Sequence, residues 1–489
     1  MILRRSLPWL VHALIALQVL SASFTATAFS TSTHNSPSAL SSSQLKSTTE
    51  DPPHEDEDPS SFPAHVQTAI IGGGLGGLAA CAALRRRGID AHVYESAPQL
   101  LRGSTGTGIM VSPNGMAALG AIDPALPDQV RREGSRIERQ HIRRTGLDGE
   151  RVGEPLDFEM ITEQVNIGWS RAQEILAGVV DVEAVVHCGA CFQSYAEVDG
   201  EESVVDITFE DGRVVRTQLL IGCDGAGSQV RQFMANSKYN EQKAAKTYAS
   251  RYSGQLLWNA IVPSSSIAPS SAGHAPNEVE YILTGEDGKV VLAFDAGPDT
   301  TSWYLTLMEE STSLPPGIKQ ALTDGAIGGF GPRPGLKDEL KAAFANWPMA
   351  IACLDATTEE MIFERRLSDR VKLPGKQWSE CRGRVVLMGD AAHPMVPSQG
   401  QGTMMTWEDA AELAACVAPA FADASSSSLA AAVKKYVRLR SKRCAVVQKY
   451  SADAYMGRTM PSFFPRKILS GMKSMRTMKY IKNGYEPSA

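Results

Sequence analysis

Short continuous apolar runs occur along the chain, and each of them leads directly into a glycine turn. The runs end at Ile71, Gly222 and Met388, and a helical pattern follows each turn. Such runs are typical of parallel strands that are buried on both faces. Between the second and third runs, polar and apolar residues alternate in residues 278–291 and 302–307. This alternation predicts antiparallel strands with one covered face.

The first run enters a dinucleotide-binding fingerprint. Gly72, Gly74 and Gly77 satisfy the pattern G-x-G-x-x-G, an Ala/Leu-rich helical stretch follows, and Ala91–Tyr94 predicts the next strand, which Glu95 closes. Gly72 permits a tight turn, Gly74 lets the backbone approach a pyrophosphate, and Gly77 lets helix and strand pack closely. The helix N-terminus favours phosphate, and the Glu95 carboxylate can accept ribose hydroxyls. The segment therefore predicts dinucleotide binding without distinguishing FAD from NAD.

Two further apolar runs each deliver a carboxylate to a glycine turn. The second run ends in Asp224-Gly225, with Arg231 in the helix that follows, and the third ends in Gly389-Asp390. A carboxylate at the end of a strand can bind sugar or ribityl hydroxyls, although it can also simply cap a helix. Residues 400–402 (GQG) then lead into another helix, whose amides could stabilise the negative charge of a reduced flavin.

These three motifs, in this order and at these separations, resemble those of the class A flavoprotein monooxygenases. These are single-component aromatic hydroxylases such as salicylate hydroxylase, with zeaxanthin epoxidase as a relative, and the resemblance spans residues 66–451. It implies a doubly wound α/β FAD-binding domain that is interrupted by an antiparallel-sheet substrate domain. We expect the FAD-binding domain in residues 64–245 and 365–455, and the substrate domain in residues 246–364.

The resemblance also implies which residues contact the cofactor. Glu95 and Arg171 correspond to contacts of the FAD adenosine half, Asp390 to a ribityl contact, and the loop around Pro397 to the isoalloxazine site. Arg171 could alternatively form a surface ion pair. The complete candidate set is Gly72, Gly74, Gly77, Glu95, Arg171, Asp224, Gly225, Arg231, Gly389, Asp390, Pro397, Gly400 and Gly402.

The implied activity is NAD(P)H- and O2-dependent hydroxylation of an aromatic or related organic substrate through a flavin hydroperoxide. Such chemistry needs a dry, oriented site and no protein nucleophile or metal, and no catalytic residue can be assigned. Cys188 and Cys191 form an isolated CxxC, and His393 could move a proton, but structural roles are favoured for all three. Carotenoid epoxidation, oxidase or reductase activity, and a non-catalytic flavin scaffold or redox sensor remain alternatives.

Aromatic residues of the predicted substrate domain are candidates for lining its pocket. They are Trp258, Tyr281, Phe294 and Trp303. Ordinary core packing accounts for each of them equally well. A small-molecule organic substrate and O2 are the expected partners.

Composition and the two ends set the context of this fold. The 489 residues are 43% hydrophobic with a net charge of -6, which gives no basic field for nucleic acid. Residues 1–63 predict a bipartite plastid presequence and an acidic linker, with secretion, an endomembrane location or a retained anchor as alternatives. Residues 456–489 are basic with a helical methionine pattern, which predicts packing onto the body or peripheral membrane contact.

Overall fold

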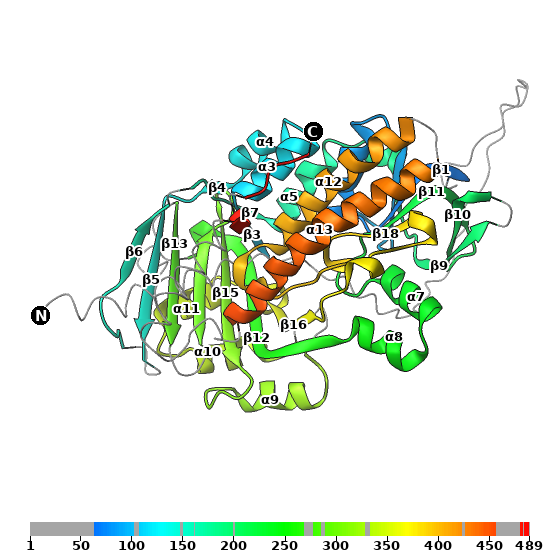
Figure 1. Ribbon diagram of the computed structural model, residues 1–489. Coiled ribbons are helices and arrows are strands. Elements are labelled where there is room, and N and C mark those ends of the chain that lie inside the picture. The colour runs from blue at the N-terminus through cyan, green and yellow to red at the C-terminus, as the bar shows by residue number, and fades with distance from the viewer. Residues whose placement is uncertain are drawn as a thin grey trace, which may run out of the picture.

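The computed structural model describes residues 63–101, 107–146, 150–160, 162–198, 201–267, 277–284, 289–327, 333–422, 426–455, 480–482 and 484–488. The predicted presequence, except its last residue, and most of the basic tail lie outside these ranges. Within them, no helix combines the length and apolar character needed to cross a bilayer. Three sheets and their covering helices form the body (Figure 1).

The largest sheet has eight strands and a parallel centre. Along its main path, the strands are β17 (Ser379–Glu380), β18 (Val385–Leu387), β11 (Val214–Gly222), β1 (His65–Ile71), β2 (Ala91–Glu95) and β8 (Val186–Cys188). All neighbouring pairs from β18 to β8 are parallel. On the side, β10 (Glu201–Phe209) pairs with β11, and β9 (Phe192–Val198) pairs with β10. The central strands are buried along their apolar runs, as parallel strands require.

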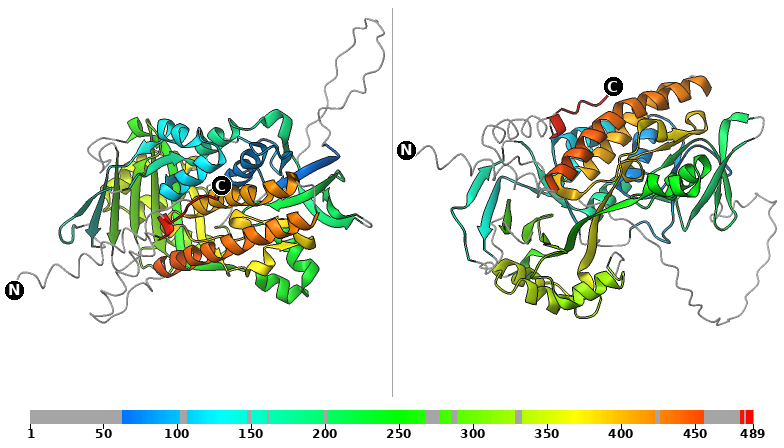
Figure 2. Two further views of the ribbon diagram at one scale, coloured as in Figure 1. Left: turned by 45° about the horizontal axis from the view of Figure 1, so that its top comes forward. Right: turned by 60° about the horizontal axis from the view of Figure 1, so that its bottom comes forward.

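Helices cover this sheet and form one continuous apolar core with it. The helix after the glycine fingerprint, α2 (Leu75–Arg85), packs against α12 (Gly402–Ala422), and α12 packs against the long α13 (Ser426–Tyr455) (Figure 2). The remaining helices of this part are α3 (Pro113–Ile122), α4 (Leu126–Glu133), α5 (Trp169–Ala177), α6 (Val182–Val185), α7 (Gln229–Lys238) and α8 (Glu241–Tyr248).

The second sheet has seven strands. In spatial order they are β16 (Phe363–Arg370), β12 (Ser250–Pro263), β15 (Thr300–Met308), β14 (Val290–Asp295), β13 (Glu278–Thr284), β5 (Arg139–Thr145) and β6 (Leu156–Glu159). All of its pairs are antiparallel except β13 with β5. The predicted antiparallel strands are present, and β5 and β6, from the first third of the chain, extend their sheet.

The two faces of the second sheet bury different sets of side chains. Trp258 and Trp303 lie in a core with α9 (Pro316–Thr323), α10 (Leu336–Ala343) and α11 (Pro348–Asp355). Phe294 and Tyr304 lie on the other face, in a core that includes Met110 of β3. The pocket-lining interpretation of the two tryptophans is therefore wrong, because helices cover their face of the sheet.

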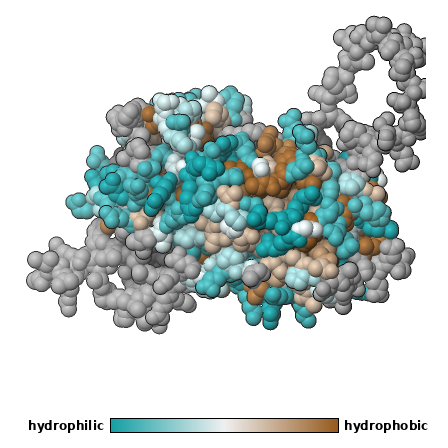
Figure 3. All heavy atoms as spheres, turned by 90° about the horizontal axis from the view of Figure 1, so that it is seen from above, coloured by the Kyte–Doolittle hydropathy of each residue, from teal (hydrophilic) through white to brown (hydrophobic). Residues whose placement is uncertain are grey.

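A small antiparallel sheet connects the two large ones. It contains β3 (Gly108–Val111), β7 (Val165–Gly168) and β4 (Ser135–Arg136). The amide of Gly168 donates to the carbonyl of Ala296 (2.8 Å), and a Cβ at Gly108 would lie 2.7 Å from the Phe294 ring. The doubly wound α/β fold with an antiparallel-sheet insertion is thus confirmed. The face seen from above carries apolar groups among polar ones (Figure 3).

Candidate active site

The predicted cofactor motifs meet at one edge of the parallel sheet. Strands β18, β11, β1 and β2 are neighbours and run in the same direction, so their carboxyl ends lie together. The residues that follow these ends include Asp390, Asp224 and Gly72, and β2 ends in Glu95. In open α/β sheets this edge is where ligands bind.

The glycine fingerprint forms a turn that side chains would obstruct at two positions but not at the third. Gly72 has φ +106°, and a Cβ there would lie 2.6 Å from the Cys223 carbonyl oxygen. A Cβ at Gly77 would lie 1.8 Å from the Gly72 oxygen, whereas a Cβ at Gly74 would meet nothing within 4 Å. Gly74 is also the N-cap of α2. The open space therefore lies at a helix N-terminus, where phosphate is favoured.

Glu95 is held beside this turn by the backbone. Its Oε2 accepts a hydrogen bond from the Gly73 amide (2.7 Å), and its Oε1 accepts one from the Ala97 amide (2.9 Å). The side chain is buried. These bonds orient the carboxylate toward the phosphate-binding turn, as a ribose contact requires.

Asp224 and Arg231 bind parts of the protein around the site. Asp224 accepts hydrogen bonds from the Ser228 hydroxyl (2.6 Å) and from the amides of Gln229 (2.6 Å) and Val230 (3.1 Å), so it satisfies the first two amides of α7 beside the N-cap residue, Ser228. Burial raises the pKa of Asp224. Arg231 donates to the Ala391 carbonyl (3.2 Å), which links the second motif to the third.

Burial lowers the pKa of Arg231 to about 10, so its guanidinium stays charged at neutral pH. Gly225 has φ +77°, in the left-handed region that favours glycine, and a Cβ there would meet nothing within 4 Å. The sequence left open whether Asp224 binds a ligand or caps a helix. In the structure, the hydrogen bonds described for Asp224 go to the start of α7.

The third motif folds into two short 3-10 turns before α12. Asp390 is buried within Gly389–Ala391, and the Gly389 amide donates to Asp409 Oδ2 (2.9 Å). The second turn, Pro397–Gln399, ends at Gly400 with φ +61°, and α12 begins at Gly402. A Cβ at Gly402 would meet nothing within 4 Å. The start of α12 therefore has room for a ligand beside its first amides.

His393 is part of a buried ionic cluster behind these turns. Its Nε2 lies 2.5 Å from Asp409 Oδ2, and Arg440 Nε donates to Asp409 Oδ1 (2.6 Å). Burial alone would lower the pKa of His393, but Cys444 and Asp409 raise it well above its ordinary value. Burial would raise the pKa of Asp409, but His393 and Arg440 lower it to about 2.

This cluster also brings three groups of metal-ligand type within 4.8 Å of one another: His393, Asp409 and Cys444. Arg440 contacts both Asp409 and the Cys444 sulfur (3.6 Å). The guanidinium already supplies the positive charge, so we assign no metal to the cluster.

Arg171 pairs with acidic side chains, although its helix α5 contacts the glycine turn through Gln173, whose Nε2 donates to the Gly73 carbonyl (3.0 Å). Its guanidinium is about half exposed and pairs with Glu133 (2.8 Å) and Glu174 (2.5 Å). This is the surface ion pair that the sequence left as the alternative. Arg171 lies in the first turn of α5, from which its long side chain reaches both acids. We therefore leave Arg171 out of the proposed site.

The CxxC cysteines do not form a disulfide. Cys188 and Cys191 are both partly buried, at and after the end of β8. Among the described residues, the group of metal-ligand type that can be identified includes neither of these cysteines.

A polar cluster at the second sheet, which the sequence did not indicate, faces the small connecting sheet. Arg365 Nη2 of β16 donates to Thr107 Oγ1 (3.1 Å), and the Asn259 amide of β12 lies 3.5 Å from the same oxygen. The Tyr304 hydroxyl of β15 accepts from the Gly108 amide (2.6 Å) and donates to its carbonyl (2.9 Å). These contacts attach the sheet to the segment that enters β3.

Strand β3 connects this cluster to the turn before α12. The Ser112 hydroxyl, directly after β3, accepts a hydrogen bond from Gln401 Nε2 (3.0 Å). Burial lowers the pKa of Arg365 to about 10, which still leaves it cationic at neutral pH. Arg365 therefore places a positive charge on the face of the second sheet that contacts the small connecting sheet.

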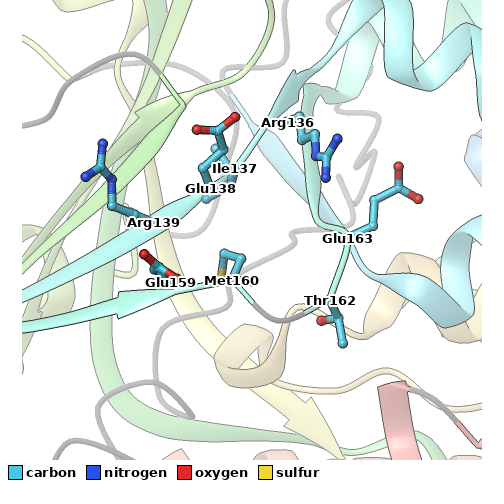
Figure 4. A pocket seen from close by; sticks show the side chains of 8 residues that line it. All are labelled: Arg136, Ile137, Glu138, Arg139, Glu159, Met160, Thr162 and Glu163. Atoms are coloured by element: carbon cyan, nitrogen blue, oxygen red, sulfur yellow. The ribbon is translucent and has the colours of Figure 1, made fainter.

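A pocket of about 390 Å³ lies elsewhere, between β4, β5 and the segment after β6 (Figure 4). Its lining residues are Arg136, Ile137, Glu138, Arg139, Glu159, Met160, Thr162 and Glu163. They carry charges of both signs, and they include no residue of the four strand-end turns. We assign it no part in the cofactor site.

Comparisons with known proteins agree with this geometry. A family described as FAD binding domain matches residues 65–252 and 352–448. The chain is 29% identical over 395 residues to 6-hydroxynicotinate 3-monooxygenase of Bordetella bronchiseptica, a match that covers 79% of this chain and 90% of the relative. It is 27% identical over 393 residues to 3-amino-4-hydroxybenzoate 2-monooxygenase of Streptomyces cremeus, covering 78% and 85%.

Chloroplastic zeaxanthin epoxidase of Spinacia oleracea is 28% identical over 402 residues, which cover 78% of this chain but 52% of the epoxidase. Among solved structures, Klebsiella pneumoniae HpxO complexed with FAD and uric acid has a TM-score of 0.62 at 22% identity, covering 84% of this chain and 93% of that one. The 2,6-dihydroxypyridine-3-hydroxylase from Arthrobacter nicotinovorans has a TM-score of 0.61 at 19% identity, covering 83% and 95%.

Proposed function

Because the chain belongs to the FAD binding domain family, as a class A flavin-dependent monooxygenase, we propose that it uses NAD(P)H and O2 to hydroxylate an aromatic substrate that carries an anionic group. The observation that carries the proposal is the meeting of four strand-end turns at one sheet edge, together with a partly buried cation of the second sheet, Arg365, that contacts the segment entering β3. FAD is the cofactor of this family, and the predicted family is confirmed.

The geometry fits FAD at the strand ends. The open space at Gly74 suits the pyrophosphate, the oriented carboxylate of Glu95 suits the adenosine ribose, and Asp390 suits the ribityl chain. The free space at Gly402, beside the first amides of α12, suits the isoalloxazine edge that becomes negative on reduction. When bound, FAD would carry two electrons from the nicotinamide to O2, so that one oxygen atom of O2 is inserted into the substrate and the other leaves as water.

The protein's contribution is to hold the substrate in place and exclude water. Around Arg365, the sheet face toward the connecting strands is mostly apolar, with Leu257, Phe294 and Leu367 in one buried core. A charged group inside such a face interacts more strongly with an opposite charge than it would in water. We assign Arg365 the role of holding a carboxylate or phenolate of the substrate.

The names of two relatives support an acidic aromatic substrate, since 6-hydroxynicotinate and 3-amino-4-hydroxybenzoate are both carboxylates. NADPH and NADH are both retained as electron donors. The chloroplastic relatives support a plastid location directed by residues 1–63, with secretion or an endomembrane location as the alternative.

Carotenoid epoxidation is the second candidate function, supported by the zeaxanthin epoxidase relatives. The chain spans about half the length of these relatives. A carotenoid is neutral, so Arg365 would have no charged group to bind in such a substrate.

One titration series tests the proposal. Purified protein loaded with FAD is mixed without oxygen with NADH or NADPH, and flavin bleaching is followed with and without 6-hydroxynicotinate, substituted benzoates or zeaxanthin. We expect acidic aromatics to accelerate bleaching and to yield hydroxylated products after air is admitted. If neither NADH nor NADPH reduces the bound flavin in the presence of any of these compounds, the result would instead indicate a non-catalytic flavin scaffold.

Paired variants of β16 separate the substrate assignment from the general activity. Arg365→Met should weaken the acceleration of flavin bleaching by acidic aromatics at least about tenfold, because it removes a charge-assisted contact worth roughly 1.5–3 kcal/mol. Arg366 lies over the Tyr252 ring at 4.2 Å, and Arg366→Met serves as the matched control. Equal responses of the two variants would contradict the role of Arg365 while leaving the monooxygenase assignment intact.

A further inference from the structure

The end of the chain returns to the main core and contacts α12 and α13 (Figure 1). We call the described part of this segment, residues 480–482 and 484–488, the C-terminal strap. Its Ile481 is fully buried in the core around the large sheet. Arg443 of α13 donates to the carbonyls of Tyr480 (3.2 Å) and Ile481 (2.8 Å). The strap thus satisfies donors of a guanidinium that is itself buried.

A second attachment joins the strap to α12. Glu412 is buried, and its carboxylate accepts hydrogen bonds from the Tyr485 hydroxyl (3.2 Å), the Ser488 amide (2.9 Å) and the Ser488 hydroxyl (2.7 Å). Burying a carboxylate is costly unless it is paired or hydrogen-bonded. These bonds therefore favour the docked strap over the free one.

From Arg443, buried polar contacts continue to the turn before α12. Arg443 Nε and Nη2 donate to the two Glu408 oxygens (2.6 and 2.7 Å), and Asn114 Nδ2 donates to Glu408 Oε1 (2.8 Å). The same Asn114 nitrogen donates to Gln401 Oε1 (2.9 Å). Gln401 is fully buried between Gly400 and Gly402, the two glycines of the proposed isoalloxazine site.

Buried networks of this kind tolerate little rearrangement, because each member left without its partner carries a desolvation penalty. Arg440 provides a parallel contact, since it donates to both Glu408 and Asp409. Asp409 in turn holds the Gly389 amide. The strap and the cofactor turns are thus attached to consecutive turns of the same helix, α12.

We propose that the C-terminal strap positions the cofactor loop, residues 397–402, through Arg443, Glu408, Asn114 and Gln401, so that its docking tightens FAD binding. The inference rests on the FAD cofactor within the proposed function and is independent of the substrate. By linkage, FAD binding must also favour the docked strap. Terminal segments open at low free energy, so the strap is a suitable place for such control.

Full-length variants test this coupling. Tyr485→Phe with Ser488→Ala removes two of the three donors to Glu412 and leaves the α12–α13 network intact. We expect FAD to dissociate at least about fivefold faster, the low end of coupling between sites. Glu486→Gln, an exposed change in the same strap, is the matched control and should dissociate at the wild-type rate.

Hydrogen exchange on the apo protein gives a readout that needs neither activity nor bound flavin. Amides of residues 398–405 should exchange faster in the double variant, in parallel with those of the strap. Arg443→Lys, which keeps a charge but cannot reach two Glu408 oxygens and two carbonyls together, should have the same effect.

Faster exchange confined to the strap, with wild-type exchange at residues 398–405 and wild-type FAD dissociation, would overturn the proposal. If Arg443→Lys does not fold, the strap double variant decides alone. Failure of the proposed aromatic hydroxylation would leave both of these readouts unchanged.

Discussion

Two alanine substitutions in the glycine fingerprint should separate cofactor binding from folding. Gly74→Ala places a Cβ where nothing lies within 4 Å, and the residue has φ -72° and ψ -172°, which any L-residue adopts. We therefore expect the unfolding free energy of the apo protein to change by less than about 0.5 kcal/mol, so that its thermal midpoint stays the same. The added methyl occupies the space proposed for the pyrophosphate, so FAD affinity should fall.

The expected loss follows from distance. Gly74 is the N-cap of α2, and a phosphate that binds helix amides must approach its backbone closely. Moving the phosphate away gives up one or two charge-assisted hydrogen bonds, each worth roughly 1.5–3 kcal/mol. A decrease in affinity of at least about tenfold should result, since 1.4 kcal/mol corresponds to a factor of ten.

Gly77→Ala should behave in the opposite way. Its Cβ would lie 1.8 Å from the Gly72 carbonyl oxygen, so α2 must shift away from the turn that follows β1. Overpacking of this kind costs about 1–3 kcal/mol or more, and the apo protein itself should melt earlier. Flavin-fluorescence titration and thermal melts without FAD measure the two effects. Wild-type FAD affinity in Gly74→Ala would refute the assignment of the phosphates to this turn.

Three other predictions concern buried and exposed charges. Asp409→Asn removes the anion that His393 and Arg440 share, leaves Arg440 with Glu408 alone, and should cost about 3–5 kcal/mol in unfolding free energy, read as a lower melting midpoint. The exposed Asp128→Asn should cost less than about 1 kcal/mol. Arg171→Ala should change FAD affinity less than about twofold, and a tenfold loss in the same titration would return Arg171 to the site. Burial, with His92 and Arg213, lowers the pKa of His187 to about 4, so the unfolded state binds more protons between pH 6.5 and 4 and stability should fall as pH falls through that window. In His187→Gln, the melting midpoint should depend less steeply on pH across this range. An unchanged pH dependence would contradict the lowered pKa of His187.

Local sequence patterns predicted the cofactor edge because each of its parts is encoded within a few residues. A strand, a glycine turn and a helix follow one another in the chain, and parallel pairing then brings Asp390, Asp224 and Gly72 to one edge. The same reasoning found Glu95, since β2 follows α2 directly. Strand direction alone was sufficient for this part of the candidate site.

Local sequence patterns could not predict the contacts between distant segments of the chain. The helix-capping role of Asp224 depends on rotamers, which leaves its two interpretations equal in sequence. Arg171 has the same sequence context whether it faces a cofactor or Glu133 and Glu174. Alternation along β12 and β15 predicted two faces, but only packing against α9 to α11 determines which face carries Trp258 and Trp303.

In the proposed substrate site, Arg365 and Thr107, which are 258 residues apart, form one of several long-range contacts between the second sheet and the segment that enters β3. Neither residue stands in a motif: Arg365 is one of several charged residues in β16, and Thr107 directly precedes β3. Their contact follows from the pairing of β16 with β12, which sets Arg365 opposite Leu257 and therefore on the face that meets the connecting sheet. A one-residue change of register would turn Arg366 to that face instead. In the proposed function, strand register determines the charge that Arg365 presents to a substrate, while local sequence determines the cofactor turns. Under this proposal, substrate preference can change among relatives that keep the same FAD motifs.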